Sequence, residues 1–358
     1  MIRTPTGAKQ CCHPTGLYIL SIAEAGERLG FYLLLALFTL YLNERLGLSE
    51  AAASTWYGNY TALAYVAALP GGWVAGRCGQ RRQWIVVGAL LLGAGYLLMG
   101  QGLRWLPWSV GVLVVGNGFF KPNISALVGQ LYRPDDANRE EGYSVFYTAI
   151  NLGGLIAPLA GELARSAFGW PATFCLAGGV LGLSVIALLL GWRHIPAART
   201  SSPEKPAHSD EENRGSTAHA ERRQLIRAVT VLLVMTAAIV PFWAAVMQSG
   251  NALTFWARDN TTRALQLLGW RFVIPPGVYA AVNPALVALL ALPVSRSFAW
   301  LAGRGKPVTP GWKMILGLLL TAAGCGVMVA AGRLGGDTGR VSQAWLIGCY
   351  LLHSCGEL

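Results

Sequence analysis

Residues 21–41 read SIAEAGERLGFYLLLALFTLY, an apolar run long enough for a membrane helix that nevertheless carries two glutamates and an arginine. At roughly 100° per residue, Glu24, Glu27, Arg28 and Tyr32 fall on one face, while leucines and phenylalanines cover the other faces as expected for a helix in lipid. A charge in the middle of a bilayer costs about 3 kcal/mol or more, so such residues face a protein interior or an aqueous cavity and have partners. The charged face is therefore a candidate functional site.

The charges of this face do not cancel, because Glu24 and Glu27 oppose Arg28 alone. We therefore expect either a protonated carboxyl or a cation from another helix. Lys121, inside the fourth apolar run and followed by a kink-forming Pro122, supplies that cation. Two simpler interpretations stay open: Glu24 and Arg28 form an i,i+4 pair that only fixes neighbouring helices, or Lys121 extends to the membrane surface.

Composition is typical of a polytopic membrane protein, since 54% of the 358 residues are hydrophobic and only 13% are charged. The formal net charge is +11, but the basic residues lie between apolar runs, which fits membrane topology better than binding of nucleic acid. The seven cysteines are scattered, without the spacing of a disulfide framework or a zinc site. We therefore predict an all-α polytopic membrane protein with lipid as its surroundings, no metal and no cofactor.

The apolar runs also define the domains. Ten segments are long enough to cross a bilayer, at about 17–42, 56–76, 83–103, 108–130, 143–165, 171–192, 225–256, 277–300, 311–332 and 342–358. They predict a six-helix bundle over 1–193, a polar linker over 194–224, and a four-helix bundle over 225–358. Arginines crowd the connection after the second run, so we expect a cytoplasmic N-terminus.

Six helices, a basic linker and a second set of helices is the layout of a transporter built from two six-helix halves. Three motifs make the resemblance specific, and they resemble the proton-dependent oligopeptide transporter family of the major facilitator superfamily. They are Glu24-x-x-Glu27-Arg28-x-x-Phe31-Tyr32, Phe120-Lys121-Pro122-Asn123 and Phe146-Tyr147-x-x-Ile150-Asn151-x-Gly153. The likeness continues to Leu352-His353-Ser354-x-Gly356-Glu357-Leu358, so the expected fold is that superfamily's, with a complete six-helix N-terminal bundle and an incomplete four-helix C-terminal bundle.

The resemblance implies proton-coupled symport of di- and tripeptides across the cell membrane, driven by a proton gradient. It assigns proton coupling to Glu24, Glu27 and Arg28, and places Arg28 and Lys121 on the peptide carboxylate. Further substrate contacts are implied for residues matched by position, namely Glu357 on the peptide amino group, Asn151 and Asn283 beside it, and the cavity aromatics Tyr32, Tyr65 and Trp243. For Tyr65 and Trp243, ordinary packing is an equally open interpretation.

The sequence departs from the family pattern at two charged positions. Gly76 stands where the family motif Gly-Gly-x-x-Ala-Asp-Arg has its aspartate, and Met247 stands where an acid usually precedes Gln248. Because the second bundle stops two helices short, the alternative is a transport-inactive, truncated remnant of such a transporter. Transport of another anion also stays open. An enzyme is disfavoured because the histidines lie mostly in the termini and linker.

Overall fold

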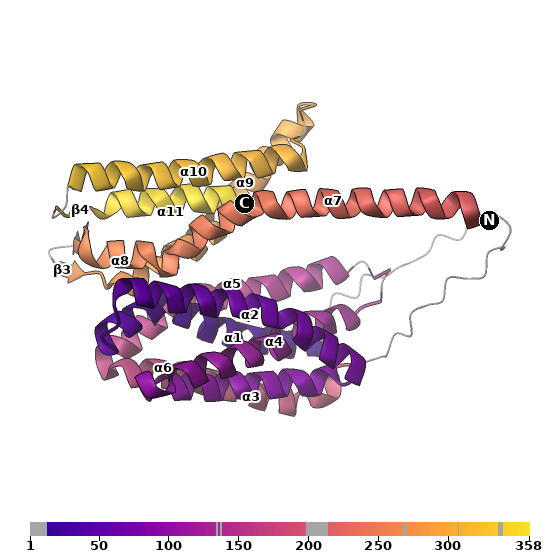
Figure 1. Cartoon of the computed structure of the whole chain (residues 1–358), viewed down its shortest axis with the longest axis horizontal. Helices are drawn as coiled ribbons and strands as arrows, with labels where there is room; N and C mark the ends of the chain where they lie inside the picture. Colours follow the sequence, from indigo (N-terminus) through magenta and orange to yellow (C-terminus); the bar gives the residue numbers. More distant parts are fainter. Residues whose placement is uncertain are drawn as a thin grey trace. The chain divides into compact units, whose positions relative to one another are not determined.

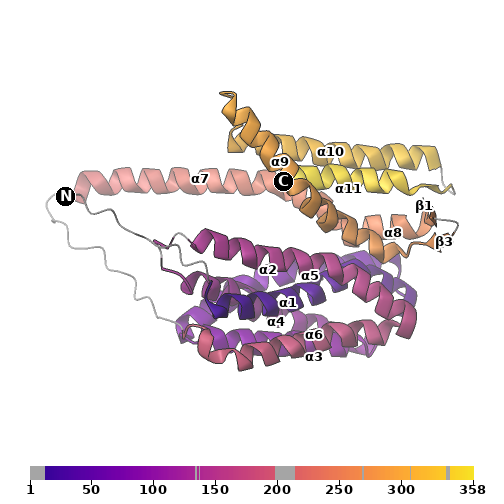
Figure 2. The same ribbon diagram turned by 180° about the vertical axis from the view of Figure 1, so that it is seen from behind.

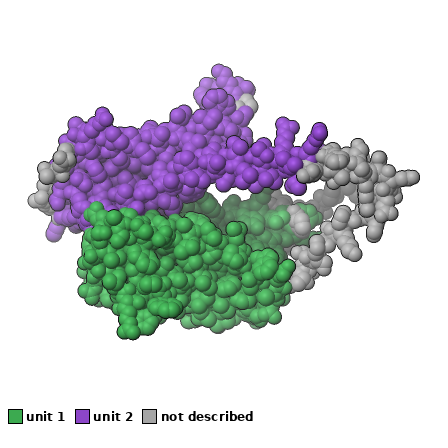
Figure 3. Space-filling model, viewed as in Figure 1, with its two compact units in different colours: residues 1–199 green, residues 200–358 purple. Residues whose placement is uncertain are grey.

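The computed structural model describes residues 13–133, 135–136, 138–197, 214–267, 270–306, 308–335 and 339–358, of which 214–222, 266, 267 and 271 are described by backbone only. The chain divides into two compact units, Met1–Arg199 and Thr200–Leu358 (Figure 3). Most of the predicted linker at 194–224 lies outside the residues with described side chains.

Unit 1 consists of six long helices, one for each of the six spans predicted from residues 17–192. They are α1 (Thr15–Leu40), α2 (Glu50–Cys78), α3 (Arg81–Met99), α4 (Leu106–Gln130), α5 (Arg139–Phe168) and α6 (Trp170–Leu190). Their boundaries follow local chemistry. Ser49 caps α2 by accepting a hydrogen bond from the backbone N–H of Ala52 (3.2 Å), and Gly79 ends it with a left-handed φ of 66°.

Helix α1 lies among α2, α5 and α6 and is the most buried helix in the described part of unit 1 (Figure 2). Leu33, Leu37 and Phe38, expected to face lipid, are fully buried instead. Because a lipid-facing and a core-facing leucine look alike in sequence, the periodicity could not distinguish the two positions. The charged face of α1 is thus enclosed by protein rather than set against lipid.

Glycines allow the helices of unit 1 to approach closely at two crossings. A Cβ at Gly71 of α2 would collide with the backbone carbonyl of Gly118 on α4. A Cβ at Gly153 of α5 would lie 2.5 Å from the carbonyl oxygen of Ala25 and 3.1 Å from Cβ of Arg28. These crossings bring α4 and α5 to α1 and α2 with backbone nearly in contact, which is how small residues pack helices in membranes.

Unit 2 is also helical, and its elements are drawn in Figure 1. They are α7 (Arg214–Val246), η5 (Met247–Gly250), α8 (Ala252–Asp259), η6 (Pro276–Ala281), α9 (Val282–Gly303), α10 (Pro310–Gly335) and α11 (Gln343–Glu357). The span predicted at about 225–256 corresponds to one candidate membrane span over Arg223–Asp259, within which a 3-10 turn separates α7 from α8. There the Thr254 hydroxyl donates to the Ser249 carbonyl (2.7 Å), and Asn251 takes a non-helical conformation (φ −128°, ψ −101°).

Four short strands, which sequence reasoning missed, join the ends of these helices. β1 (Thr261–Thr262) pairs in parallel with β4 (Val341–Ser342), and β2 (Ala264–Leu267) pairs antiparallel with β3 (Trp270–Val273). Strands of two to four residues leave no clear alternating pattern. The β1–β4 pair fixes the end of α8 beside the start of α11.

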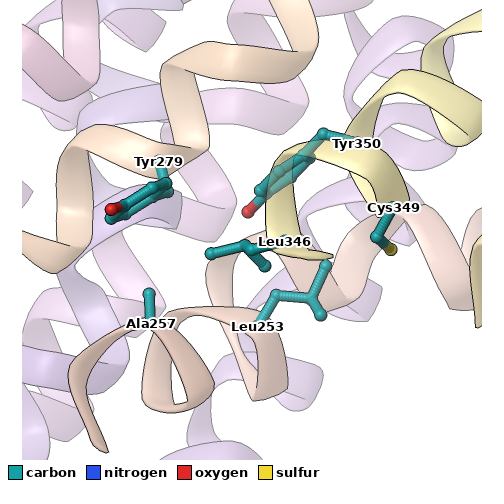
Figure 4. Packing of buried hydrophobic residues seen from close by; sticks show 6 residues of the cluster. All are labelled: Leu253, Ala257, Tyr279, Leu346, Cys349 and Tyr350. Atoms are coloured by element: carbon teal, nitrogen blue, oxygen red, sulfur yellow. The ribbon is translucent and has the colours of Figure 1, made fainter. Parts of the chain in front are cut away.

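A hydrophobic cluster holds α8, η6 and α11 together (Figure 4). Its buried members are Leu253, Ala257, Tyr279, Leu346, Cys349 and Tyr350. The Tyr279 hydroxyl donates to the side-chain oxygen of Gln343 at 2.8 Å, so the ring is buried while its polar end is satisfied. This cluster sets the position of α11, the helix that carries Glu357.

By length and apolar composition, eight helical segments in the described residues could each cross a membrane. Helix α2 and the 15-residue α11 are not among them. Six long helices in unit 1, and helices for all four predicted spans in unit 2, confirm the expected all-α polytopic architecture.

Candidate functional site

The charged face of α1 forms a buried ion pair centred on Arg28. Nε and Nη2 of Arg28 donate to Oε2 and Oε1 of Glu27 at 2.5 and 2.7 Å. Both side chains are almost inaccessible, with 4% and 1% of their side-chain surface exposed. A guanidinium that meets a carboxylate through two parallel hydrogen bonds is the strongest ion-pair geometry available to a protein. Arg28 is therefore held mainly by its sequence neighbour.

Glu24 forms the second half of the cluster and meets a cation from another helix. Its Oε1 lies 3.5 Å from Nζ of Lys121 on α4 and 3.5 Å from Nε of Arg28. Neither carboxyl oxygen of Glu24 accepts a hydrogen bond from the described residues, although the side chain is fully buried. The Lys121 side chain is 34% exposed, so the cluster is not fully closed off on the α4 side. The expectation that α4 supplies a cation to α1 thus corresponds to a direct ion pair.

Aromatic rings flank the guanidinium on its own helix. Arg28 lies 4.5 Å from the centroid of the Phe31 ring and 6.0 Å from that of Tyr32. Tyr32 in turn packs against Gly154 of α5, where a Cβ would lie 3.1 Å from the tyrosine ring. Because α5 has glycines here, it can press these side chains against the ion pairs and limit access of water.

Among the described residues, two that were assigned to the same site form no hydrogen bond with the ion pairs. The Asn151 amide donates to the Tyr147 carbonyl of its own helix at 2.9 Å. Tyr65 of α2 is 58% exposed. Their substrate-binding roles stay predictions that the geometry of unit 1 does not test.

The remaining assigned residues form a second cluster, in unit 2. The Asn283 amide of α9 donates to Oγ of Ser354 at 3.0 Å and to Oε2 of Glu357 at 3.3 Å, both on α11. Glu357 and Trp243 line the same cavity of about 230 Å³, and Trp243 meets Phe242 edge to face at 5.4 Å. Sequence reasoning assigned no role to Ser354, although it stands within the quoted α11 motif.

The two clusters offer different chemistry. The α1–α4 cluster holds two acids and two cations, so it can exchange a proton or bind an anionic group in place of a carboxylate. The α9–α11 cluster presents a carboxylate beside an amide, which suits a cationic group. The described residues contain no group of three or more His, Cys, Asp or Glu side chains able to hold a metal ion, and their five cysteines are free.

Comparison with known proteins decides the family. Residues 20–357 match the family model described as Major Facilitator Superfamily. The chain belongs to this superfamily. The Di-/tripeptide transporter of Lactococcus lactis subsp. cremoris is 29% identical, over 96% of this chain and 81% of the relative. Peptide transporter YePEPT of Yersinia enterocolitica is 28% identical, over 99% of this chain and 81% of the relative.

The solved structures agree with these relatives. The crystal structure of peptide transporter POT in complex with sulfate superposes with a TM-score of 0.80 at 25% identity, covering 98% of this chain and 81% of the other. These matches confirm membership of the proton-dependent oligopeptide transporter family within the superfamily, and with it the expectation of a multi-pass membrane transporter rather than an enzyme. The chain spans about four fifths of the length of these relatives.

Proposed function

We propose that this chain carries di- and tripeptides together with protons across the cell membrane by alternating access. The relatives named as di-/tripeptide and peptide transporters support the substrate class. The observation that supports proton coupling is the arrangement of two carboxylates on α1 with two cations, one on α1 and one on α4.

The pairing suggests how a proton and a peptide would be coupled. A proton on Glu27 removes the charge that holds Arg28, and a proton on Glu24 removes the charge that faces Lys121. Each released cation can then bind the carboxylate of a peptide. Because a proton and a peptide both favour separated ion pairs, binding of either one raises the affinity of the protein for the other. This thermodynamic linkage is what a symporter requires.

Glu357 is the proposed partner of the peptide's amino group. The Asn283 amide fixes one carboxyl oxygen of Glu357, and the adjoining cavity is lined by the apolar rings of Phe242 and Trp243. A short peptide is a zwitterion with variable side chains, so fixed charges for its termini and tolerant apolar walls suit the whole class. Asn151, Tyr32 and Tyr65 are proposed as further contacts.

The deciding experiment is uptake of a labelled dipeptide into proteoliposomes containing the whole chain, with and without an inward proton gradient. We expect accumulation only with the gradient and its loss in Lys121→Ala. The matched control is Lys306→Ala, an exposed lysine after α9, which should behave as the parent chain. Equal uptake by the Lys121→Ala and parent chains would overturn the site assignment. Absence of uptake by the folded parent chain would favour a transport-inactive protein instead, and accumulation of a different organic anion would overturn the peptide assignment.

We further infer a cytoplasmic N-terminus. Arg77 lies in the last turn of α2 and Arg81 and Arg82 begin α3, so basic residues flank this short connection, and short basic connections remain on the cytoplasmic side. An N-terminal epitope should be cleaved by protease added to inside-out vesicles and protected in right-side-out vesicles. Cleavage in right-side-out vesicles alone would reverse the proposed orientation.

A further inference from the structure

A group of arginines gathers at one end of unit 1, away from the ion pairs of α1. Arg77 is in the last turn of α2, Arg81 and Arg82 begin α3, and Arg193 follows α6. We call these four residues the arginine patch. The segment after α6 lies against the start of α3, because the Arg82 guanidinium is 4.5 Å from the ring centroid of Trp192, the neighbour of Arg193.

The patch has no acidic counterpart in the described part of the chain. None of its four arginines forms an ion pair with a carboxylate of a described residue. Arg81 reaches back over Gly76, so that a Cβ there would lie 3.4 Å from its Nη2 atom. This is the position at which the family motif carries aspartate. The side chain that could neutralise Arg81 is therefore replaced by a hydrogen atom, and among the described residues no carboxylate pairs with any of the four positive charges.

One face of α2 leads to the arginine patch, and its side chains change along the helix from apolar to charged, in the same order as the parts of a phospholipid. Leu69, Trp73 and Arg77 follow one another at intervals of four residues and so share one face. Leu69 is 76% exposed and Trp73 is 59% exposed, and the Arg77 guanidinium lies 4.4 Å from the Trp73 ring centroid. An aliphatic side chain, an interfacial ring and a guanidinium thus match an acyl chain, a glycerol region and a phosphate in the same order.

We propose that the arginine patch, together with Leu69 and Trp73, binds the headgroup phosphate of an anionic phospholipid. Guanidinium groups recognise phosphate through paired hydrogen bonds, and stacking on Trp73 and Trp192 limits the orientations of two of them beforehand. A free phosphate ion would use the arginines alone, whereas the exposed leucine and tryptophan favour a ligand with acyl chains. Clusters of basic residues at a membrane surface attract anionic lipids in this manner.

The test is a binding titration of the whole chain in neutral detergent with dioctanoyl phosphatidylglycerol, with dioctanoyl phosphatidylcholine and inorganic phosphate as competitors. At about 1 kcal/mol for each basic residue near an anionic lipid, Arg77→Gln and Arg82→Gln should each weaken phosphatidylglycerol binding about fivefold. Arg104→Gln removes an exposed arginine at the opposite end of α3 and should leave binding unchanged. Neither competitor should displace the anionic lipid.

Gly76→Asp provides a charge-restoring variant, with Gly76→Asn as its uncharged counterpart of the same shape. We expect the aspartate to engage Arg81 and weaken phosphatidylglycerol binding about fivefold, while the asparagine has little effect. Equal losses in Arg104→Gln and Arg82→Gln would mean that only net charge matters and would refute a defined site. Displacement by inorganic phosphate would replace the lipid with a simple anion as the occupant. Because the readout is binding, the result does not depend on whether the chain transports peptides.

Discussion

The two carboxylates of α1 should differ in what their removal costs, although they lie one helical turn apart. Glu27 accepts two hydrogen bonds from the guanidinium of Arg28, whereas neither oxygen of Glu24 accepts one from the described residues. We therefore predict that Glu27→Gln lowers the free energy of unfolding considerably more than Glu24→Gln does.

The size of the difference follows from the contacts. A hydrogen bond to a charged partner contributes about 1.5–3 kcal/mol, and a glutamine at position 27 keeps one of the two acceptors, so Glu27→Gln should cost about 2–3 kcal/mol. Glu24 faces Lys121 across 3.5 Å, and Lys121 is 34% exposed and can be hydrated in its place. Because glutamine at position 24 removes the desolvation cost of the fully buried Glu24 charge and loses no hydrogen bond from the described residues, Glu24→Gln should cost about 1 kcal/mol or less. The expected gap is therefore about 2 kcal/mol.

The assay is reversible denaturant unfolding in mixed micelles, followed by tryptophan fluorescence, with all variants compared in the same lipid and detergent. Glu44→Gln is the matched control, because Glu44 is a partly exposed carboxylate whose 3.8 Å pair with Arg165 lies outside the cluster. It should change stability by less than about 1 kcal/mol. If Glu24→Gln were as costly as Glu27→Gln, the assignment of Arg28 to Glu27 and of Lys121 to Glu24 would be wrong.

Two further predictions concern packing and buried hydroxyl groups in unit 1, and the same unfolding assay tests both. Gly71→Ala should lower the free energy of unfolding by about 1–3 kcal/mol, because the new methyl group meets the carbonyl of Gly118. Gly58→Ala on the same helix meets nothing within 4 Å and should raise the free energy of unfolding by up to about 1 kcal/mol. A similar effect for both variants would contradict the close crossing of α2 and α4. Tyr60→Phe should be neutral or stabilising, because the buried Tyr60 hydroxyl has no hydrogen-bond partner among the described residues. Tyr41→Phe should lower the free energy of unfolding by about 1 kcal/mol, because it loses a 2.6 Å hydrogen bond to a backbone carbonyl. A larger loss in Tyr60→Phe than in Tyr41→Phe would refute this reasoning.

Much of the molecule was predictable from local sequence. Apolar runs of about twenty residues gave the helices, because length and polarity decide what can cross a bilayer. The excess of negative charge on α1 led to the prediction of a cation from elsewhere, and Lys121 of α4 lies beside Glu24. Three short motifs indicated the family that the comparisons then confirmed.

The tertiary structure decided how these parts meet. Sequence spacing left an i,i+4 pair of Glu24 with Arg28 open, and the structure has that contact at 3.5 Å, but Glu27 meets the guanidinium more closely and Glu24 also lies 3.5 Å from Lys121. Helical periodicity specifies which side chains share a face, but the pairing of charges depends on distances of a few ångströms. Those distances follow from the glycine crossings that bring α4 and α5 against α1 and α2.

The sequence by itself determined the helices, the family and the set of charged residues, because each depends on composition and spacing along one segment. Only the tertiary structure determined the burial of α1 on its apolar faces, the break between α7 and α8, and the approach of Asn283 to Ser354 and Glu357. The burial of α1 and the approach of Asn283 to α11 depend on contacts between segments far apart in the chain, and no local pattern encodes such distances.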